Sequence, residues 1–238
     1  AKHNGRAQYA LFDPTMHLHV VQRLHLEQDL RKALEREDLE LYYQPIVSLK
    51  TLKIVGFEAL LRWHHPQHGF ISPQEFIPIA EETGLIVSMG QWVLHAACQQ
   101  LATWQAQFPQ QSLKISVNLS VQQLQPSLLM QLENAIAASR IVPSSLVLEL
   151  TESMLAENIA STQTLLNQLK SLDVRLSIDD FGTGYSSLSY LSRLPMDNLK
   201  IDRAFVNPPE SDTRNQVIAE SIIALSNLLE LSVTAEGI

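Results

Sequence analysis

Short, nearly all-apolar segments alternate with longer amphipathic segments along most of this 238-residue chain. The short segments predict strands at 41–47, 54–61, 113–118, 146–150, 174–178, 199–201 and 231–235. The longer ones predict helices at 73–82, 88–107, 122–139, 159–172, 186–192 and 214–229. Strands that are apolar on both faces are typical of a parallel sheet covered by helices. The pattern therefore predicts an α/β fold, and seven such strands in one domain favour a barrel whose eighth strand is not accounted for.

Composition and charge limit the classes of function. Hydrophobic residues make up 45% of the chain, a value typical of a domain with a full core. We find no apolar run long enough to span a bilayer and no signal peptide at the start. The formal net charge of −8 argues against binding of DNA or RNA polymers, which requires a basic surface. A single cysteine, Cys98, excludes an intrachain disulfide and indicates a reducing, cytoplasmic setting. Membrane attachment through segments outside this sequence stays open.

Two adjacent carboxylates, Asp179 and Asp180, follow the apolar segment 174–178 and precede a glycine-rich turn. Adjacent strand residues point to opposite faces, so both carboxylates can share a site only where the strand ends and the backbone turns. Carboxylates placed in this way suit hard cations such as Mg²⁺ or Mn²⁺. The alternative interpretation is a solvated, Asp-rich turn.

Further polar side chains recur at the ends of the predicted strands or, in one case, within a strand. They are Glu58, Asn118, Glu149, Glu152, Lys200, Asp202 and Glu236. The carboxyl ends of the strands of a parallel barrel share one face, so these side chains are expected to meet there. A single charge is more often a solvated residue or an ion-pair partner. Several unpaired carboxylates are costly to bury, however, and bound cations would neutralise them. The pattern therefore favours a metal site.

The motifs that carry these residues resemble those of EAL-domain cyclic-di-GMP phosphodiesterases. They are Tyr42-Tyr43-Gln44-Pro45, Phe57-Glu58-Ala59-Leu60-Leu61-Arg62-Trp63, Val117-Asn118-Leu119-Ser120, Glu149-Leu150-Thr151-Glu152, Asp179-Asp180-Phe181-Gly182-Thr183-Gly184, Leu199-Lys200-Ile201-Asp202-Arg203 and Ala235-Glu236-Gly237. The resemblance covers nearly everything from Leu39 to Ile238. It implies a modified (β/α)₈, TIM-like barrel with one antiparallel strand. It also implies hydrolysis of cyclic di-GMP to linear pGpG with one or two Mg²⁺ or Mn²⁺ ions.

The resemblance further implies roles for individual residues. The first metal ion would be held by Glu58, Asn118, Glu149 and Asp179, and the second approached by Asp179 and Asp180. The catalytic residues would be Lys200, Glu236 and Glu58. Lys200 would orient the attacking water or stabilise developing charge, and Glu236 would act as a base or as a metal-shell ligand. The nucleotide would contact Gln44, Arg62 and Asp202, and Glu152 would anchor the turn after Asp180.

The N-terminal stretch from Gly5-Arg6-Ala7-Gln8-Tyr9 to Phe12-Asp13 resembles the tail of a GGDEF (diguanylate cyclase) domain. We expect residues 1–22 to end a preceding GGDEF-like domain, residues 23–38 to form a connector helix, and residues 39–238 to form the EAL domain. The sequence begins without Met, so we expect it to be a piece of a longer protein. The resemblance implies preceding GGDEF and sensory domains in that full protein. The resemblance also implies a homodimer formed through the helix predicted at 186–192.

The sequence departs from the family at its end. The family continues after Ala235-Glu236-Gly237 with a further Glu, a last strand, and a helix that carries a Gln, whereas this sequence stops at Ile238. We therefore expect an incomplete EAL domain whose barrel lacks its last strand and helix. Two alternatives to the enzyme stay open. One is a catalytically weak or inactive cyclic-di-GMP receptor, and the other is a regulatory module that relays a signal to a neighbouring domain.

Overall fold

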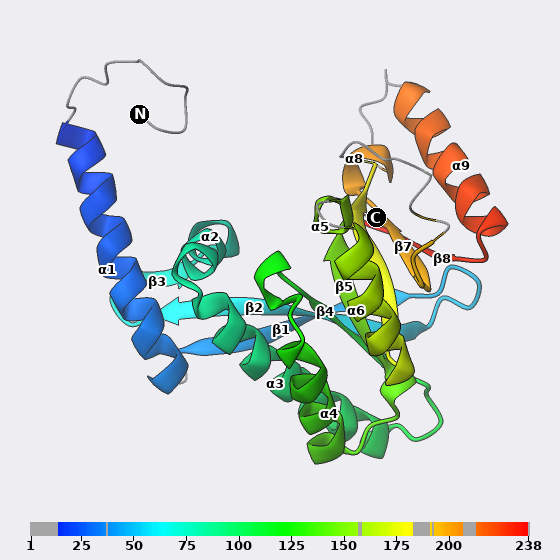
Figure 1. Ribbon diagram of the computed structural model, residues 1–238, viewed down its shortest axis with the longest axis horizontal. Helices are drawn as coiled ribbons and strands as arrows, with labels where there is room; N and C mark the ends of the chain where they lie inside the picture. The colour runs from blue at the N-terminus through cyan, green and yellow to red at the C-terminus, as the bar shows by residue number, and fades with distance from the viewer. Residues whose placement is uncertain are drawn as a thin grey trace. The chain divides into compact units, whose positions relative to one another are not determined.

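A computed structural model describes residues 14–36, 38–156, 159–182, 191, 193–206 and 213–237 (Figure 1). The chain divides into two compact units, the first made of residues 1–40 and 62–85 and the second of residues 41–61 and 86–238. Strands β1 and β2 contribute residues to both units. None of the described helices combines the length and the hydrophobicity that a bilayer span requires.

The first unit is built on a long N-terminal helix. Its elements are α1 (Pro14–Arg36), the end of β2, β3 (Gly69–Ile71) and α2 (Pro73–Thr83). Helix α1 packs against α2, and it buries Leu30 and Ala33 completely. Trp63 at the end of β2 is also fully buried, with its ring edge-on to Phe76 of α2. The helix begins at Pro14, earlier than residue 23, where the connector helix is expected to begin.

The ends of α2 follow from local sequence. The Ser72 hydroxyl accepts a hydrogen bond from the Gln74 N–H at 3.3 Å, and Pro73 occupies the first turn, where no backbone N–H is needed. Gly84 ends the helix with φ of 75°, a left-handed conformation that glycine adopts without steric cost. Cap, proline and glycine therefore define this helix, and the predicted range of 73–82 is close to the observed one.

The second unit contains most of the sheet. Its strands are β1 (Leu39–Val47), β2 (Ile54–His65), β4 (Lys114–Asn118), β5 (Leu146–Thr151), β6 (Arg175–Phe181), β7 (Asn198–Ile201) and β8 (Ser232–Ala235). They lie in the order β1-β2-β4-β5-β6-β7-β8, and every pair from β2 to β8 is parallel. Residues 48–53 connect β1 to its neighbour β2, a link too short for a parallel crossover, so β1 runs antiparallel (Figure 1). Each predicted strand is present.

The helices of the second unit follow the strands. They are α3 (Leu85–Gln107), α4 (Ser127–Ser139), α5 (Glu152–Ala156), α6 (Ile159–Ser171), α8 (Arg203–Val206) and α9 (Thr213–Leu228), with 3-10 turns η1 (Val121–Gln123) and η2 (Pro143–Ser145). The short elements β3, α5 and α8 were not predicted. The single helix predicted at 122–139 is wrong in its first part, because a 3-10 turn precedes α4. The helix predicted at 186–192 lies outside the described residues except for Leu191.

The core of the second unit lies between the sheet and the helices α3, α4 and α6. Its fully buried side chains include Leu101 of α3, Leu132 of α4, Leu166 of α6, Ile115 of β4 and Leu148 of β5. Strand β5 is buried at every position from Leu146 to Leu150, as expected where a parallel strand is covered on both faces. Burial of this strand places its polar end, and the ends of its neighbours, at a fixed edge of the core.

Leu148→Ala should lower the free energy of unfolding by about 2–5 kcal/mol, because it leaves a cavity at a fully buried position of a central strand. The matched control is Met130→Ala on α4, where the side chain is 60% exposed, and there the change should stay within about 0.5 kcal/mol. Urea unfolding followed by circular dichroism measures both. Equal losses in the two variants would contradict the assignment of the core.

Candidate functional site

Seven polar residues come together in the second unit, six of them at or near the carboxyl ends of parallel strands and one, Glu58, within a strand. They are Glu58 on β2, Asn118 on β4, Glu149 on β5, Asp179 and Asp180 on β6, Lys200 on β7, and Glu236 directly after β8. Strand register makes some of them level with one another, since Asn118 pairs with Glu149 across β4 and β5. The Glu236 N–H donates to the carbonyl of Ile201 at 3.1 Å, which ties the residue to the end of β7.

The Lys200 ammonium group lies at the centre of this cluster. Its Nζ is 2.7 Å from Glu149 Oε2, 3.0 Å from Glu58 Oε2, 3.2 Å from Asp179 Oδ1 and 2.6 Å from Glu236 Oε1. Lys200 and Glu149 are each only 2% exposed. An ammonium group has three hydrogens to donate, so it cannot satisfy four carboxylates at once. Negative charge therefore remains around it.

Asn118 and Lys200 together hold the Glu58 carboxylate. Asn118 Nδ2 donates to Glu58 Oε1 at 2.7 Å, while Lys200 Nζ donates to Glu58 Oε2 at 3.0 Å. With one donor on each oxygen, the Glu58 carboxylate has a defined orientation. Since the Asn118 side chain uses its amide nitrogen here, its amide oxygen can face another ligand.

A β-bulge lets Asp179 and Asp180 serve the same site. Ile178 pairs with Leu199 and Phe181 with Ile201, so β6 contains one residue more than β7 over this interval. Asp180 has φ of 53°, and its N–H donates to Asp179 Oδ1 at 3.0 Å. Such a bulge re-aims a side chain without ending the strand. The expectation that the strand ends at Ile178 is therefore wrong, since β6 continues to Phe181 and the bulge provides the turn.

Burial and like charge shift the pKa values of the cluster. Burial is the main reason that the pKa of Glu149 is raised to about 7, with Lys200 opposing the shift and Glu58 adding to it. Burial also raises the pKa values of Asp180 and Glu236. Burial alone would lower the pKa of Lys200, but the surrounding carboxylates outweigh it and raise that pKa well above its usual range. Lys200 thus stays charged at any physiological pH.

The donor set fits a hard divalent cation. Ligand oxygens of Asp179, Asp180 and Glu236 lie within 4.8 Å of one another. Glu58, Asn118 and Glu149 add further oxygen ligands beside them. Five carboxylates against one ammonium group leave a formal excess of four negative charges when all are ionised. Carboxylate and amide oxygens are the preferred ligands of such cations, whose charge would offset this excess.

Two other predicted site residues hold local backbone structure beside the cluster. Glu152, the first residue of α5, is 4% exposed and its Oε2 accepts a hydrogen bond from the Gly182 N–H at 3.1 Å. This contact joins α5 to the residue directly after β6. Asp202 follows β7, and its Oδ1 accepts a hydrogen bond from the Ala204 N–H at 2.8 Å, which caps the short helix α8. The roles predicted for both residues stay predictions.

The remaining predicted residues lie on the first two strands. Gln44 is an exposed residue of β1 in the second unit. Arg62 is a half-buried residue of β2, and it belongs to the first unit. The contacts described for the carboxylate cluster include neither residue, and their predicted contact with a nucleotide stays a prediction.

Sequence reasoning missed a support beneath the loop that follows Asn118. The Gln123 side chain is 4% exposed, and its Oε1 accepts a hydrogen bond from the Ser120 N–H at 3.0 Å. Its amide lies directly against Gly90 of α3, where an added Cβ would come within 1.9 Å of Gln123 Nε2. Glycine at position 90 therefore makes room for the side chain that closes this loop. The only sequence signal is the Ser120-x-x-Gln123 spacing of a capping box.

Fold and site together define a domain of the (β/α) barrel class with an oxygen-rich candidate metal centre at the carboxyl ends of its strands. The sequence matches the EAL domain family over residues 27–238. The chain therefore belongs to the EAL domain family, as its motifs predict.

Similar proteins have known names and structures. MucR of Pseudomonas aeruginosa, a bifunctional diguanylate cyclase/cyclic di-GMP phosphodiesterase, is 45% identical in an alignment that covers 100% of this chain and 35% of that protein. PdeR of Escherichia coli, a cyclic di-GMP phosphodiesterase, is 38% identical over 100% of this chain and 36% of its own length. The chain thus spans about a third of the length of these relatives.

A solved structure of the PaMucR phosphodiesterase in complex with c-di-GMP has a TM-score of 0.86 and 46% identity, covering 90% of this chain and 87% of that one. The EAL enzyme Bd1971, with cAMP and cyclic di-GMP bound, also has a TM-score of 0.86, at 37% identity and with 92% and 60% of the two chains covered. This agreement over most of the chain confirms the predicted TIM-like barrel class.

Gly90→Ala should lower the free energy of unfolding by about 1–3 kcal/mol, because the new methyl group overlaps the buried Gln123 amide. Gln123→Ala alone should also destabilise, since it removes the acceptor for the Ser120 N–H. In the double variant the new methyl group no longer overlaps the Gln123 amide. The double variant should therefore lose less unfolding free energy than the sum of the two single losses, by on the order of 1 kcal/mol. A double-mutant cycle in urea measures this coupling free energy. Strict additivity of the two losses would argue against a contact between residue 90 and Gln123.

In chelator, the protein should become more stable as the pH falls from about 7.5 to 5. The pKa of Glu149 is raised to about 7 on folding, so the folded state binds a proton that the unfolded state releases in this window, and lower pH favours folding. Glu149→Gln should remove on the order of 1–2 kcal/mol of this pH dependence. Thermal unfolding of the wild type and of Glu149→Gln at several pH values measures the difference in pH dependence. The histidines contribute equally to both proteins, so their titration does not affect this difference. The same slope in both would contradict the shift.

Proposed function

We propose that this chain is a phosphodiesterase domain that hydrolyses cyclic di-GMP to linear pGpG. The observation that carries the proposal is the buried Lys200 ammonium group amid four carboxylates at the carboxyl ends of the parallel strands. In α/β barrels that edge is where active sites are built. The relatives support the choice of substrate, since MucR and PdeR are named for action on cyclic di-GMP and the PaMucR structure holds it.

The proposal includes one or two Mg²⁺ or Mn²⁺ ions. Glu58, Asn118, Glu149 and Asp179 would hold the first, and Asp179 and Asp180 the second. When bound, such ions neutralise the phosphate and lower the pKa of a coordinated water. The support is the excess negative charge of the cluster and its all-oxygen donor set.

In the proposed reaction water adds to phosphorus and one ester P–O bond breaks, so that the product carries a terminal phosphate and a free hydroxyl. Lys200 stays protonated, because its carboxylate neighbours raise its pKa, and it would therefore act as a fixed positive charge that orients the water or stabilises developing negative charge. Glu236 would accept one proton of the water, and the leaving ester oxygen would take up a proton from solvent to become the free hydroxyl. Its carboxylate is partly open to solvent, with 30% of the side chain exposed, and burial raises its pKa towards the range that suits a general base.

Substrate contacts complete the proposal. Gln44 and Arg62 would contact the nucleotide, since a guanidinium group can bind a phosphate with two parallel hydrogen bonds. Asp202 uses Oδ1 to cap α8, which leaves its second carboxylate oxygen to face a ligand. Glu152 would keep the backbone after Asp180 in place through its bond to the Gly182 N–H.

The setting of the domain is also a proposal. We infer a GGDEF-like domain before it, with residues 1–22 as the tail of that domain and residues 23–38 as connector; the name of MucR, a bifunctional diguanylate cyclase/cyclic di-GMP phosphodiesterase, supports this inference. We further infer a cytoplasmic, homodimeric protein. The helix at 186–192 that would form the dimer lies outside the described residues except for Leu191.

Glu58→Gln should reduce cyclic-di-GMP turnover by on the order of 10²–10³-fold or more, because it removes a metal ligand and a partner of Lys200. The control is Glu133→Gln on α4, which makes the same chemical change at an exposed position and should keep full activity. Chromatography of pGpG in Mg²⁺ or Mn²⁺, with and without chelator, measures turnover.

A fully active Glu58→Gln protein, or turnover that survives chelation, would contradict the proposed mechanism. A wild-type chain that binds cyclic di-GMP but forms no pGpG would instead establish the alternative function, a catalytically inactive cyclic-di-GMP receptor. Binding should therefore be measured beside turnover, with the same preparation and the same metal.

A further inference from the structure

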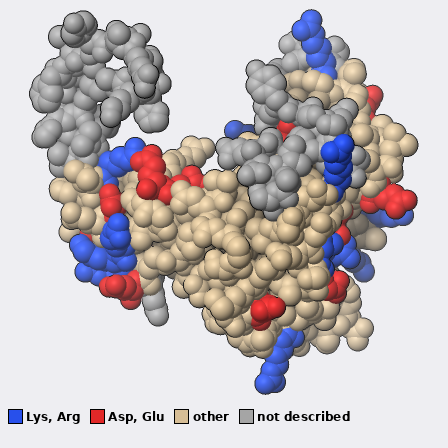
Figure 2. Space-filling model, in the orientation of Figure 1, with Lys and Arg blue, Asp and Glu red and all other residues tan. Residues whose placement is uncertain are grey.

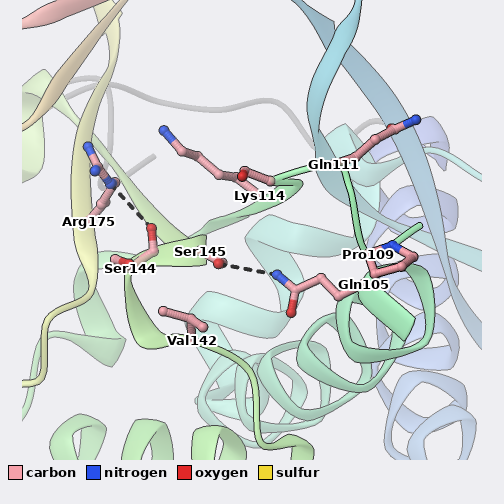
Figure 3. Close-up of a pocket in the computed structure, with 9 residues that line it drawn as sticks. Gln105, Pro109, Gln111, Lys114, Val142, Ser144, Ser145 and Arg175 are labelled. Atoms are coloured by element: carbon pink, nitrogen blue, oxygen red, sulfur yellow. Dashed lines mark hydrogen bonds between the residues drawn. The ribbon is translucent and has the colours of Figure 1, made fainter. Parts of the chain in front are cut away.

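The amino-terminal edge of the same sheet has the opposite electrostatic character. Lys114 begins β4 and Arg175 begins β6, so both lie at the end of the sheet opposite to the carboxylate cluster. They line a pocket of about 400 Å³ in the second unit, together with Gln105, Pro109, Gln111, Ser112, Val142, Ser144 and Ser145. No lining residue is acidic. Figure 3 shows Lys114 and Arg175 on one side of the pocket, with Gln105 and Pro109 on the other.

Among the described residues, no carboxylate is paired with either of the two cations, Lys114 and Arg175. Asp197 is close enough to influence Lys114, but both of its oxygens bind Lys170 Nζ at 2.8 Å and one also accepts from the Leu176 N–H at 2.8 Å. Burial and then the neighbouring Arg175 lower the pKa of Lys114. Like charges therefore face each other with little compensation.

The walls of the pocket are fixed by hydrogen bonds. Arg175 Nε donates to the Ser144 carbonyl at 3.2 Å, which holds the guanidinium group against η2 (Figure 3). The Gln105 amide nitrogen lies 3.2 Å from both the Leu113 carbonyl and Ser145 Oγ, and so joins α3 to the start of β4 and to η2. No described hydrogen bond uses the terminal nitrogens of Arg175 or the Lys114 ammonium group. These groups are the donors that a ligand would meet.

We propose that this pocket binds a small anion through a phosphate group. Two cations that begin different strands, with the hydroxyls of Ser112 and Ser144 nearby, supply donors from several directions. A phosphate offers more acceptor oxygens in more directions than a planar carboxylate, and both guanidinium and ammonium groups bind it well. The site is separate from the carboxylate cluster and does not depend on the proposed catalysis. The phosphate could be inorganic or belong to a nucleotide.

Titration calorimetry at constant ionic strength, in chelator and without divalent metal, tests the proposal with inorganic phosphate, pyrophosphate and GMP as probes. The wild-type chain should show saturable binding of at least one probe. Lys114→Gln/Arg175→Gln should weaken it about tenfold or more, since each removes a charged hydrogen bond. Lys114→Gln alone should weaken it at least about threefold, and it leaves the Arg175–Ser144 bond intact. Binding of GMP would show that the pocket accepts the phosphate of a nucleotide. Binding of phosphate or pyrophosphate without binding of GMP would show that the ligand is an inorganic anion.

The matched control is Lys50→Gln/Lys53→Gln, which removes the same charge from the exposed turn between β1 and β2. It should bind the probes as the wild type does. Circular dichroism and pGpG formation should be unchanged in every variant, which separates loss of the pocket from loss of the fold or of the enzyme. No saturable binding by the wild type, or equal weakening in the control, would overturn the proposal.

Discussion

The ammonium group of Lys200 is the interaction on which the carboxyl-terminal edge of the sheet depends. Its partners come from β2, β5, β6 and the residue after β8, so one side chain joins strands that are far apart in the sequence. Removing one partner of a buried ion pair typically costs 3–5 kcal/mol, because the other charge is left uncompensated. The cluster is nevertheless not balanced, since three donated hydrogens face four carboxylates. The same arrangement thus stabilises the edge and leaves it with the negative charge that a divalent cation requires.

Much of this edge could be predicted from the sequence, because the strands and the polar residues of the site are recognised by different sequence patterns. Strands buried on both faces appear as short apolar segments, and a polar residue at the end of such a segment stands out, as Asn118 and Glu149 do. What the sequence could not show is how Asp179 and Asp180 come to share one site. The glycine at 182 indicates a turn, whereas the structure has a β-bulge, in which β6 carries one residue more than β7 and continues as a strand. A bulge depends on the register of the neighbouring strand, which local sequence does not contain.

The errors in the helices have a related cause. Apolar spacing continues from Leu124 through Leu128 to Leu132, so periodicity alone predicts one helix from 122. Pro126 instead lies at the N-terminal boundary of α4, where no backbone N–H is needed for the helix hydrogen bonds. The residues before it form a separate 3-10 turn. That turn brings Gln123 against Gly90. These positions lie on different elements and only tertiary packing relates them, so the capping-box spacing of Ser120 and Gln123 could not reveal the contact with Gly90.

The sheet has two distinct edges because the neighbouring strands β2, β4, β5, β6, β7 and β8 all run in the same direction. Helices that follow parallel strands begin at the carboxyl edge and end at the amino edge. Helix dipoles thus favour anions such as Glu152 at the first edge and cations such as Lys170 at the second. Each dipole is worth only about 0.3–1 kcal/mol and fades within a turn. The full charges of side chains therefore decide what each edge binds. On the described surface that Figure 2 shows, Lys and Arg residues are scattered and do not form one large basic patch. At the amino edge those charges are Lys114 and Arg175, which face a pocket with no acidic lining residue and therefore outweigh the dipole of the nearby end of α3.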